Sequence, residues 1–326
     1  MKLPSLAYVK EVIGIYRYAY RNWPSVLLNL AFRGRARAVT RDGRVVEGDD
    51  VTIGGIARLY SRYTPITVDA FEKLWLISQR TQSYETIAHL GYRLYGVRCC
   101  RLVDVSDDLS YIAIEVDGKK ATMYGWRNID FIGDINGYMD LNVADLSVLD
   151  VGAYVGDSAI LFALRGARRV VAVEPSPWAY SIAKKNVEVN GLTGVITLVN
   201  CAVGREDGKM LMLPSGEVDT GFRATAALAG DVPVPTCTLD SLIERYGPFD
   251  VVKVDCEGCE HESIPYSRRI GEAKEILVEY HDGYEGIVRK LREEGFKNIK
   301  YSRLSGGELR NKPLNQWLGL IYASKQ

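Results

Sequence analysis

A short apolar run that ends in Asp150 and leads into two glycines constrains this chain more than any other feature. Gly152 and Gly156 follow the acid, and a helix-like segment comes next. A second apolar run at 169–173 ends in Glu174, 18 residues beyond Gly156. A strand, a glycine turn, a helix and a second strand with an acidic end form the kind of site that binds a nucleotide-type cofactor, because the second acid can hold a ribose diol.

The spacing of the glycines separates two classes of cofactor. A dinucleotide site has the pattern G-x-G-x-x-G, whose third glycine serves the phosphate-binding turn. This chain has D-x-G-x-x-x-G at 150–156, which resembles the form found in S-adenosylmethionine enzymes, whose cofactor has no pyrophosphate. We therefore predict a site for S-adenosylmethionine, with contacts from Asp150, Gly152, Ala153, Gly156, Glu174, Pro175, Asn200, Cys201 and Asp255.

Each of these contacts has a purely structural alternative. Asp150 and the glycines can form a turn without a ligand, Glu174 can cap the helix that follows, and Asn200 can form an ordinary Asn turn. If the cofactor binds, Glu174 accepts hydrogen bonds from both ribose hydroxyls. Asn200 then bonds the adenine amino group, and the backbone at Cys201 or Ala202 reads the ring edge.

From about residue 146 onward, strands alternate with helices, which is the pattern of a parallel sheet. Strands are predicted at 147–151, 169–174, 195–200, 250–255 and 274–280, and helices at 157–165, 176–190, 239–246 and 284–294. The segments 297–303 and 317–324 have no helix between them, so they should pair as an antiparallel hairpin. The fold class is therefore α/β, and the arrangement is similar to the Rossmann-like, seven-stranded sheet of class I methyltransferases.

A series of short motifs follows over residues 146–282. They are D-V-G-A-Y-V-G at 150–156, E-P-S-P at 174–177, N-V-E-V-N at 186–190, N-C-A-V-G at 200–204, T-L-D at 238–240, K-V-D-C-E-G-C-E at 253–260 and E-Y-H at 279–281. In this order they resemble the FkbM-type methyltransferases. The resemblance implies S-adenosylmethionine as methyl donor and a hydroxyl oxygen on a sugar or natural product as acceptor. The chain departs from the family at Tyr154, where Asn is common, and near Asp157, where Thr is common.

Four ionisable residues beyond the predicted fourth and fifth strands are candidate catalytic groups. Asp255 ends the fourth strand, Glu257 and Glu260 follow it on a turn or short helix, and His281 ends the fifth strand. Grouped carboxylates can raise one pKa and so create a base, or they can bind a cation or an amine. His281 is the histidine best placed to remove a proton. Helix N-terminal charge and a capping or core histidine are the structural alternatives.

Lys253 and two cysteines lie among these acids. Because a buried lysine is costly unless it is paired, we expect Lys253 to meet Glu257, Glu279 or another acid of the cluster. Cys256 and Cys259 are expected to serve in packing. They have the spacing of half a zinc site, but no second C-x-x-C exists and the chain has only 3 histidines, so no metal is predicted. A disulfide is possible if the source is a hyperthermophile.

Residues 1–130 lack the alternating pattern and are predicted to form a helical and hairpin region that caps the site and selects the acceptor, with the cofactor-binding domain at 131–326. Helices are expected at 5–22, from a Ser25 cap to about residue 32, and twice within 68–95, with hairpin turns at 42–43 and 117–118.

Residues 1–41 contain eight basic residues and one acidic residue, so 8 − 1 = +7. This segment can meet nucleic acid, anionic lipid or a phosphorylated substrate, or it can be a solvated helix face.

The favoured function is O-methylation of a hydroxyl on a sugar, glycan or other small molecule. An RNA methyltransferase that grips RNA through the basic segment is the first alternative. The balance of 41 basic and 41 acidic residues and the lack of an Asn-Pro-Pro-aromatic motif argue against it. A non-catalytic cofactor-binding module is the second alternative, and the glycine spacing disfavours a nicotinamide dehydrogenase.

The sequence contains no apolar stretch long enough to span a bilayer and no secretory signal, which predicts a cytoplasmic protein. An amphipathic N-terminus still permits contact with a membrane surface. The oligomeric state stays open.

Overall fold

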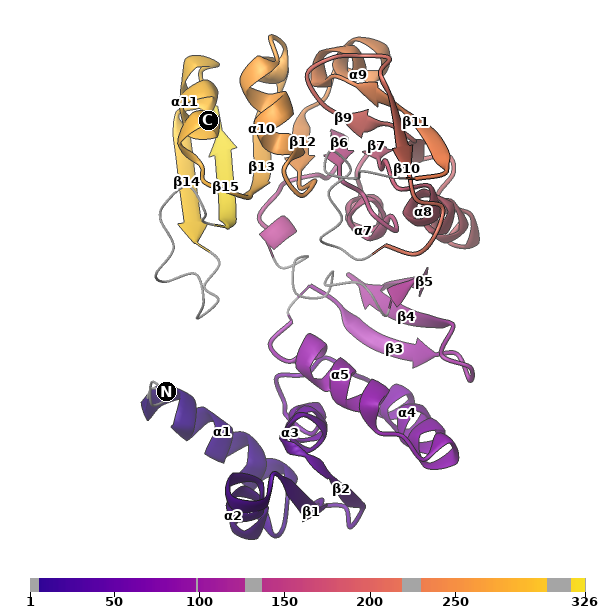
Figure 1. Cartoon of the computed structure of the whole chain (residues 1–326), viewed down its shortest axis with the longest axis vertical. Coiled ribbons are helices and arrows are strands. Elements are labelled where there is room, and N and C mark those ends of the chain that lie inside the picture. Colours follow the sequence, from indigo (N-terminus) through magenta and orange to yellow (C-terminus); the bar gives the residue numbers. More distant parts are fainter. Residues whose placement is uncertain (1–5, 98, 127–136, 219–229, 304–317, 326) are drawn as a thin grey trace. The chain divides into compact units, whose positions relative to one another are not determined.

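The computed structural model describes residues 6–97, 99–126, 137–218, 230–303 and 318–325. They divide into two compact units, Met1–Glu115 and Val116–Gln326 (Figure 1). The division lies before the strand 119–124, whereas the sequence analysis placed a boundary at residue 130. The reason is that the side-chain oxygens of Asn186 and Asn190 accept hydrogen bonds from the backbone of Tyr124 and Thr122, at 2.8 Å each, which ties this strand to the second unit.

The first unit contains helices and short antiparallel strand pairs. The helices are α1 (Leu6–Ala19), α2 (Trp23–Arg33), α3 (Asp50–Leu59), α4 (Val68–Thr81) and α5 (Glu85–Leu94), and the strands are β1 (Arg35–Val39), β2 (Val45–Asp49), β3 (Arg101–Val105) and β4 (Tyr111–Val116). β1 pairs with β2, and β3 pairs with β4. The predicted helices at the start of the chain and within 68–95 and the turn at 42–43 are confirmed, whereas α3 and β3 were not predicted.

Two local details of this unit differ from or add to the sequence analysis. The prediction that Ser25 caps the second helix is wrong, because α2 already begins at Trp23 and Pro24 occupies its first turn, where proline is well tolerated. Helices α3 and α5 pack closely because both carry glycine at the crossing. A Cβ on Gly91 would lie 1.9 Å from the carbonyl oxygen of Gly55.

The second unit alternates strands with helices. Its strands are β5 (Lys119–Tyr124), β6 (Ser147–Val151), β7 (Arg169–Val173), β8 (Ile196–Val199), β9 (Ala202–Val203), β10 (Met210–Leu213), β11 (Val232–Cys237), β12 (Val251–Val254), β13 (Glu275–Tyr280), β14 (Asn298–Arg303) and β15 (Gly319–Ser324). Its helices are α7 (Asp157–Leu164), α8 (Pro177–Val189), α9 (Leu239–Tyr246), α10 (Cys259–Ser263) and α11 (Glu285–Glu293), with short 3-10 turns at Ile264–Tyr266 and Ile270–Glu272.

Seven of these strands form one sheet in the order β14-β15-β13-β12-β6-β7-β8. The strands from β13 to β8 run parallel, and β15 is antiparallel to both of its neighbours. The predicted parallel strands and the closing hairpin are therefore confirmed. The sheet is the α/β, Rossmann-like sheet of class I methyltransferases.

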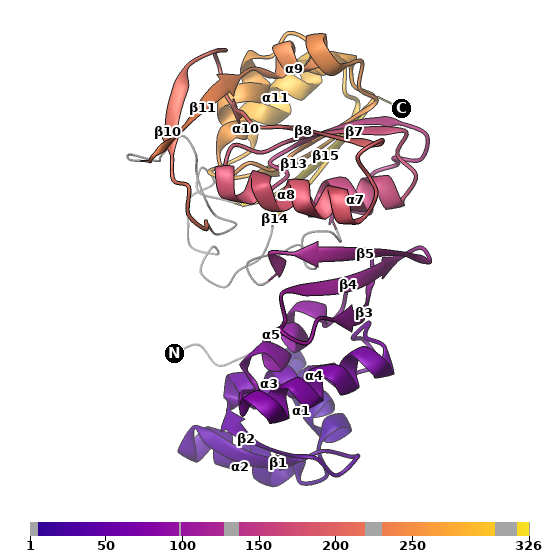
Figure 2. The same cartoon turned by 90° about the vertical axis from the view of Figure 1, so that its right-hand side faces the viewer.

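Helices cover both faces of this sheet, with α7 and α8 on one face and α9 and α11 on the other (Figure 2). Apolar side chains of α9 and α11, such as Leu242 and Ile287, pack with Val252, Val254 and Ile276 of the sheet in one buried cluster. Alternate residues of the same strands point to the α7 face. Asp150 and Lys253 belong to this second set, so two charged side chains are buried on the α7 side of the sheet.

A smaller sheet with the order β10-β11-β9 stands beside the large one. It was not predicted, because β11 contains Pro233 and Pro235 and proline normally argues against a strand. Within the parts of the chain that the structure describes, no helix combines the length and apolar character that a bilayer span requires.

Candidate active site

The predicted site residues converge on one edge of the large sheet. β6, β7, β12 and β13 run parallel, so their carboxyl ends meet where open α/β sheets bind ligands. Asp150 lies near the end of β6, and Glu174, Asp255 and His281 directly follow β7, β12 and β13. Residues separated by up to 131 positions thus come together at one edge.

A buried ion pair supports the glycine turn. Asp150 and Lys253 are register partners on β6 and β12, and Lys253 Nζ is 3.0 Å from Asp150 Oδ1. Their exposed fractions are 0% and 1%. Burial alone would lower the pKa of Lys253, but the charges of Asp150 and Asp255 raise it above its ordinary value. Ser158 of α7 donates a 2.6 Å hydrogen bond to Asp150 Oδ2, so helix and sheet share the same carboxylate.

Lys253 also holds the turn in place. Its Nζ donates a 2.6 Å hydrogen bond to the carbonyl oxygen of Gly152 and lies 3.9 Å from Asp255 Oδ2. The expectation that Lys253 pairs with an acid is confirmed. The main acid is Asp150 rather than Glu257 or Glu279, because strand register sets Asp150 directly beside it. Being fully buried, Asp150 acts on the turn through Lys253.

Gly152 is required by the protein itself. Its φ is 77°, and a Cβ at this position would lie 1.6 Å from the carbonyl oxygen of Asp255. From its place in the motif, Gly152 was predicted to let the backbone come close to the ligand. The structure adds that any other residue here would collide with the loop that follows β12.

Glu174 has the geometry that a ribose-binding carboxylate needs. It is 5% exposed, and its two oxygens accept hydrogen bonds from the backbone N–H groups of Tyr154 and Ser176, at 2.8 Å each. A carboxylate offers about four acceptor positions, so capacity remains for two hydroxyls. Burial raises the pKa of Glu174 to about 7 against the lowering effect of these hydrogen bonds. The cap of α8 is the Ser176 side chain, which removes the capping alternative for Glu174.

Asn200 joins the ends of two strands. Its Nδ2 donates to the carbonyl oxygens of Glu174 at 2.8 Å and Pro175 at 3.1 Å. These bonds commit the amide nitrogen to the protein. The two bonds also orient Asn200 Oδ1, which can accept a hydrogen bond from the amino group of adenine. The residues at this edge therefore fit the nucleoside part of S-adenosylmethionine.

Two disulfides connect segments that follow the strands of this domain. Cys201–Cys237, with a sequence separation of 36, joins the segment after β8 to the end of β11. Cys256–Cys259 closes a short turn after β12. Cys259 belongs to the buried apolar cluster and Cys256 packs against it, so the predicted packing role is confirmed. The turn also brings their Cα atoms to 5.4 Å and joins them in the disulfide that the sequence analysis had left possible.

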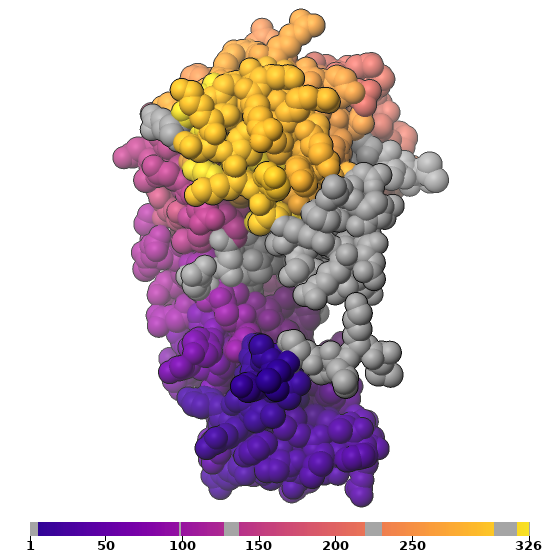
Figure 3. Space-filling view, turned by 90° about the vertical axis from the view of Figure 1, so that its left-hand side faces the viewer, coloured from indigo at the N-terminus to yellow at the C-terminus, as the bar shows by residue number. Residues whose placement is uncertain are grey.

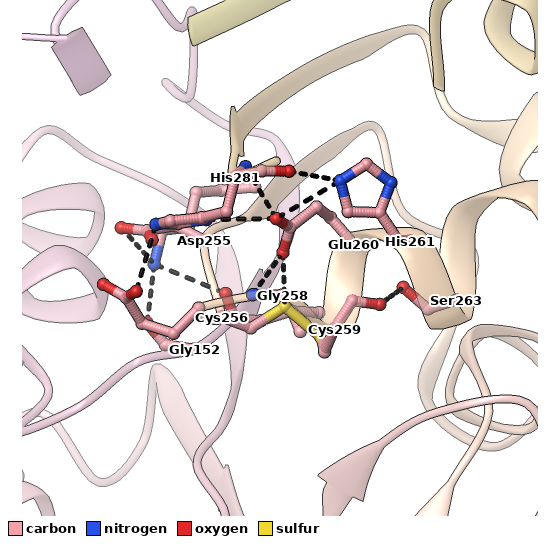
Figure 4. The surroundings of a disulfide bond; sticks show 12 residues. Gly152, Asp255, Cys256, Gly258, Cys259, Glu260, His261, Ser263 and His281 are labelled. Atoms are coloured by element: carbon pink, nitrogen blue, oxygen red, sulfur yellow. Dashed lines mark hydrogen bonds and ion pairs between the residues drawn. A yellow bond between two sulfur atoms is a disulfide. The ribbon is translucent and has the colours of Figure 1, made fainter. Parts of the chain in front are cut away.

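The second ionic group of the site lies in the turn and the short helix α10 that follow β12 and at the end of β13 (Figure 4). His281 Nδ1 is 3.0 Å from Glu260 Oε1, and His281 Nε2 is 3.1 Å from Glu257 Oε2. Glu260 also accepts hydrogen bonds from the backbone of His281 and Gly258, at 2.8 Å each. The histidine thus lies between two carboxylates.

This setting disfavours the predicted role of His281 in removing a proton. Burial by itself lowers the pKa of His281, but the hydrogen bonds and charges of Glu257 and Glu260 outweigh it and raise the pKa to about 10. At neutral pH the ring is an imidazolium, and a general base must be unprotonated. His281 instead positions the two glutamates.

Exposure separates the three carboxylates. The Glu260 side chain is 0% exposed, whereas Glu257 and Asp255 are 25% and 18% exposed. A fully buried side chain whose two oxygens already bond the protein cannot meet an acceptor. Of the four candidate catalytic residues, Asp255 and Glu257 are the two that an acceptor can reach.

Tyr138 belongs to the site and was not predicted. Its hydroxyl donates a 2.5 Å hydrogen bond to Asp255 Oδ2, and its ring lies 5.2 Å from Lys253 Nζ. The side chains of Asp150, Lys253, Asp255 and Tyr138 thus form one connected chain of contacts. No local motif surrounds Tyr138, so no sequence signal placed it here. Within the described ranges, no group of three or more His, Cys, Asp or Glu residues is arranged to hold a metal ion.

The family follows from a comparison with sequence profiles. Residues 150–297 match the profile of the Methyltransferase FkbM domain. The domain is a member of the FkbM methyltransferase family. The FkbM domain begins at Asp150 and covers Glu174, Asn200, Asp255 and His281, so it includes all the strand ends described above. Residues 150–297 therefore form an S-adenosylmethionine-dependent methyltransferase domain, whose cofactor is S-adenosylmethionine. No curated protein matches its sequence significantly.

Solved structures of methyltransferases are also similar to the chain. Trm5b from Pyrococcus abyssi is 15% identical, with a TM-score of 0.37, and the match covers 66% of this chain and 56% of that one. TYW2 from M. jannaschii in complex with AdoMet is 14% identical, with a TM-score of 0.36 and coverages of 66% and 85%. A SAM-dependent methyltransferase from Agrobacterium tumefaciens is 13% identical, with a TM-score of 0.41 and coverages of 67% and 71%. The chain thus spans little more than half of the Pyrococcus protein, and likenesses at these scores carry no argument about substrate.

Proposed function

We propose that the enzyme methylates a hydroxyl group of a sugar, glycan or other small, uncharged acceptor. The supporting observation is the charge of the acceptor side. Asp255, Glu257 and Glu260 carry three negative charges, and His281 supplies one positive charge, so −3 + 1 = −2. A phosphate-rich acceptor such as RNA would be repelled there, whereas a neutral hydroxyl can donate to a carboxylate. This observation disfavours the RNA alternative.

On the cofactor side, we assign the ribose contact to Glu174 and the adenine contact to Asn200 Oδ1 and the backbone at Cys201. The turn from Gly152 through Ala153 to Gly156 would lie along the methionine part, held by Asp150 and Lys253. When bound, the cofactor supplies an electrophilic methyl group for in-line displacement. The task of the protein is then to align the acceptor oxygen with that methyl carbon.

We assign the removal of the acceptor proton to Asp255. Its backbone contacts Gly152, so its carboxylate lies at the glycine turn. Tyr138 and Lys253 fix its orientation from two sides. A positioned carboxylate within hydrogen-bond reach of the acceptor hydroxyl can contribute roughly 10²- to 10⁴-fold to the rate. Glu257, which His281 holds, would bind a second hydroxyl of the acceptor.

The experiment measures S-adenosylhomocysteine formation with a panel of hydroxylated sugars and glycans, and with RNA, alongside calorimetric binding of S-adenosylhomocysteine. We expect Asp255→Asn to lower turnover by about 100-fold or more while cofactor binding stays within a few-fold. Glu174→Ala should abolish cofactor binding. The control is Glu262→Gln, a nearby, partly exposed acid on α10 that pairs with Arg205, and it should change neither quantity.

Two outcomes would contradict the proposal separately. Full turnover by Asp255→Asn would remove Asp255 as the base but leave the substrate class untouched. Methyl transfer to RNA, with none to any sugar or glycan, would overturn the substrate class.

A further inference from the structure

Helix α2 exposes an apolar face. Of its 11 residues, only Val26 is buried. Leu28 is 59% exposed and Phe32 is 83% exposed. Pro24 and Ala31 are exposed as well. These four residues follow the spacing i, i+4, i+7 and i+8, so they form one stripe along the helix.

This face is presented rigidly. The side chain of Asn22 donates to the carbonyl oxygen of Arg37 at 2.9 Å and accepts from the backbone N–H of Val39 at 2.8 Å, which ties the start of α2 to β1. At the other end, Gly34 turns the chain directly into β1. The apolar stripe is therefore a feature of the folded unit and not of a loose terminus. In Figure 3 the N-terminal helices, coloured indigo, lie at the surface of the first unit.

Positive charge surrounds the stripe. α2 contains no acidic residue and ends in Arg33. Arg35 and Arg37 follow on the exposed side of β1, where Arg37 pairs with Glu47 of β2 at 3.3 Å. Over residues 6–49 the chain has eight basic and four acidic residues, so 8 − 4 = +4.

The neighbouring helix α1 has the same character. α1 packs against α2, and its residues Leu6, Lys10, Ile13 and Arg17 share one face by helical spacing. Leu6 and Ile13 are 71% and 37% exposed, and Lys10 and Arg17 are exposed. Apolar and cationic side chains thus alternate along α1.

We propose that α1 and α2 bind the surface of a membrane that contains anionic lipid. An apolar helix face flanked by arginine and lysine lies in the interface with its apolar side at the boundary of headgroups and acyl chains, while the cations meet lipid phosphates. Leu28 and Phe32 insert, and Arg17 and Arg33 bind headgroups. This binding would hold the enzyme where acceptors attached to lipid are found.

Two other occupants fit the surface less well. A stable dimer buries about 800 Å² on each partner over some 20 to 30 residues, and α2 is a helix of 11 residues about 16 Å long. RNA binds through clustered cations, whereas the exposed stripe of α2, Pro24, Leu28, Ala31 and Phe32, is apolar and has its cations at the side.

The test is flotation of the full chain with vesicles of phosphatidylcholine alone or mixed with phosphatidylglycerol. We expect binding to the mixed vesicles that weakens as salt is raised. Leu28→Ser combined with Phe32→Ser should weaken this binding roughly tenfold or more. The matched control is Val68→Ser combined with Leu76→Ser on α4, which are 75% and 66% exposed, and it should bind as the wild type does. Arg17→Gln combined with Arg33→Gln should reduce both the affinity and its salt dependence.

Several results would overturn the proposal. One is a wild-type protein that does not float with either vesicle. Another is an equal loss of vesicle binding in the double variants of α2 and α4, because binding would then not depend on the stripe of α2. A third is a wild-type protein that binds no vesicle and has twice the monomer mass in light scattering, when Leu28→Ser combined with Phe32→Ser returns the mass to that of a monomer. This result would make the stripe a contact between two copies. Binding of RNA but not vesicles would assign the surface to nucleic acid.

Discussion

Two ionic groups lie at the same edge of the sheet, and they differ in construction. The turn cluster, Asp150 with Lys253 and Ser158, is set by strand register, is almost fully buried and has charges that cancel. The loop cluster, Glu257 and Glu260 with His281, comes from the turn and short helix after β12 and from the end of β13. It keeps a net negative charge, with one glutamate partly exposed. Buried, neutralised charge thus supports the turn, while the partly exposed excess of negative charge lies where we propose that the acceptor binds.

The largest effect should come from breaking the turn cluster. Lys253→Met leaves Asp150 buried without its cation, so the free energy of unfolding should fall by about 3 to 5 kcal/mol. Chemical denaturation measures this change. Adding Asp150→Asn should restore part of the loss, and the exposed Lys300→Met is the control. A loss under about 1 kcal/mol would show that the pair behaves like a surface ion pair.

The two disulfides of the domain should differ next. Removing Cys201–Cys237 with two alanines frees a loop with a separation of 36 residues and should cost about 4 kcal/mol of unfolding free energy. Removing Cys256–Cys259, with a separation of 3, should cost about 2 kcal/mol. Denaturation of the two double variants gives the comparison. Equal losses would mean that the short disulfide stabilises the folded loop directly.

The loop cluster should make stability depend on pH between 6.5 and 10, whereas the raised pKa of Lys253 in the turn cluster acts above its ordinary value of 10.5. The pKa of His281 is raised from 6.5 to about 10 in the folded protein, so its stabilising proton is fully bound below 6.5 and is lost as pH rises through 10. The melting temperature should therefore fall between pH 6.5 and 10, and fall less steeply in His281→Gln. Identical slopes for the two proteins would contradict the ion-paired imidazolium.

The smallest effect concerns the cofactor. Burial raises the pKa of Glu174 to about 7, and ribose hydroxyls are best accepted by the charged carboxylate. Binding of S-adenosylhomocysteine should therefore strengthen by about tenfold from pH 6 to pH 8. Calorimetry at both pH values measures it, and Glu174→Gln should bind weakly with no such dependence. A wild-type affinity that is flat over this range would argue against ribose contact by Glu174.

The features that sequence predicted are those with local signals. Apolar runs, glycines after helices and the order of strands and helices are written in neighbouring residues, so the parallel strands of the sheet and its closing hairpin could be placed within about a residue or two at each end. The strand β11 was missed because its prolines contradict the usual strand pattern. Helix α3 was missed within a stretch where no strong start or stop signal had been identified.

By itself, the sequence determined the fold class, the cofactor class and the edge of the sheet where the acidic residues gather. Only the tertiary structure decided what those residues do there. The pairing of Lys253 with Asp150, the hydrogen bond from Tyr138 to Asp255 and the contact of His281 with Glu260 all join residues that are 21 to 117 positions apart in the chain. Such contacts depend on which strands become neighbours and on how deeply each charge is buried, and neither quantity can be read from residues adjacent in the chain.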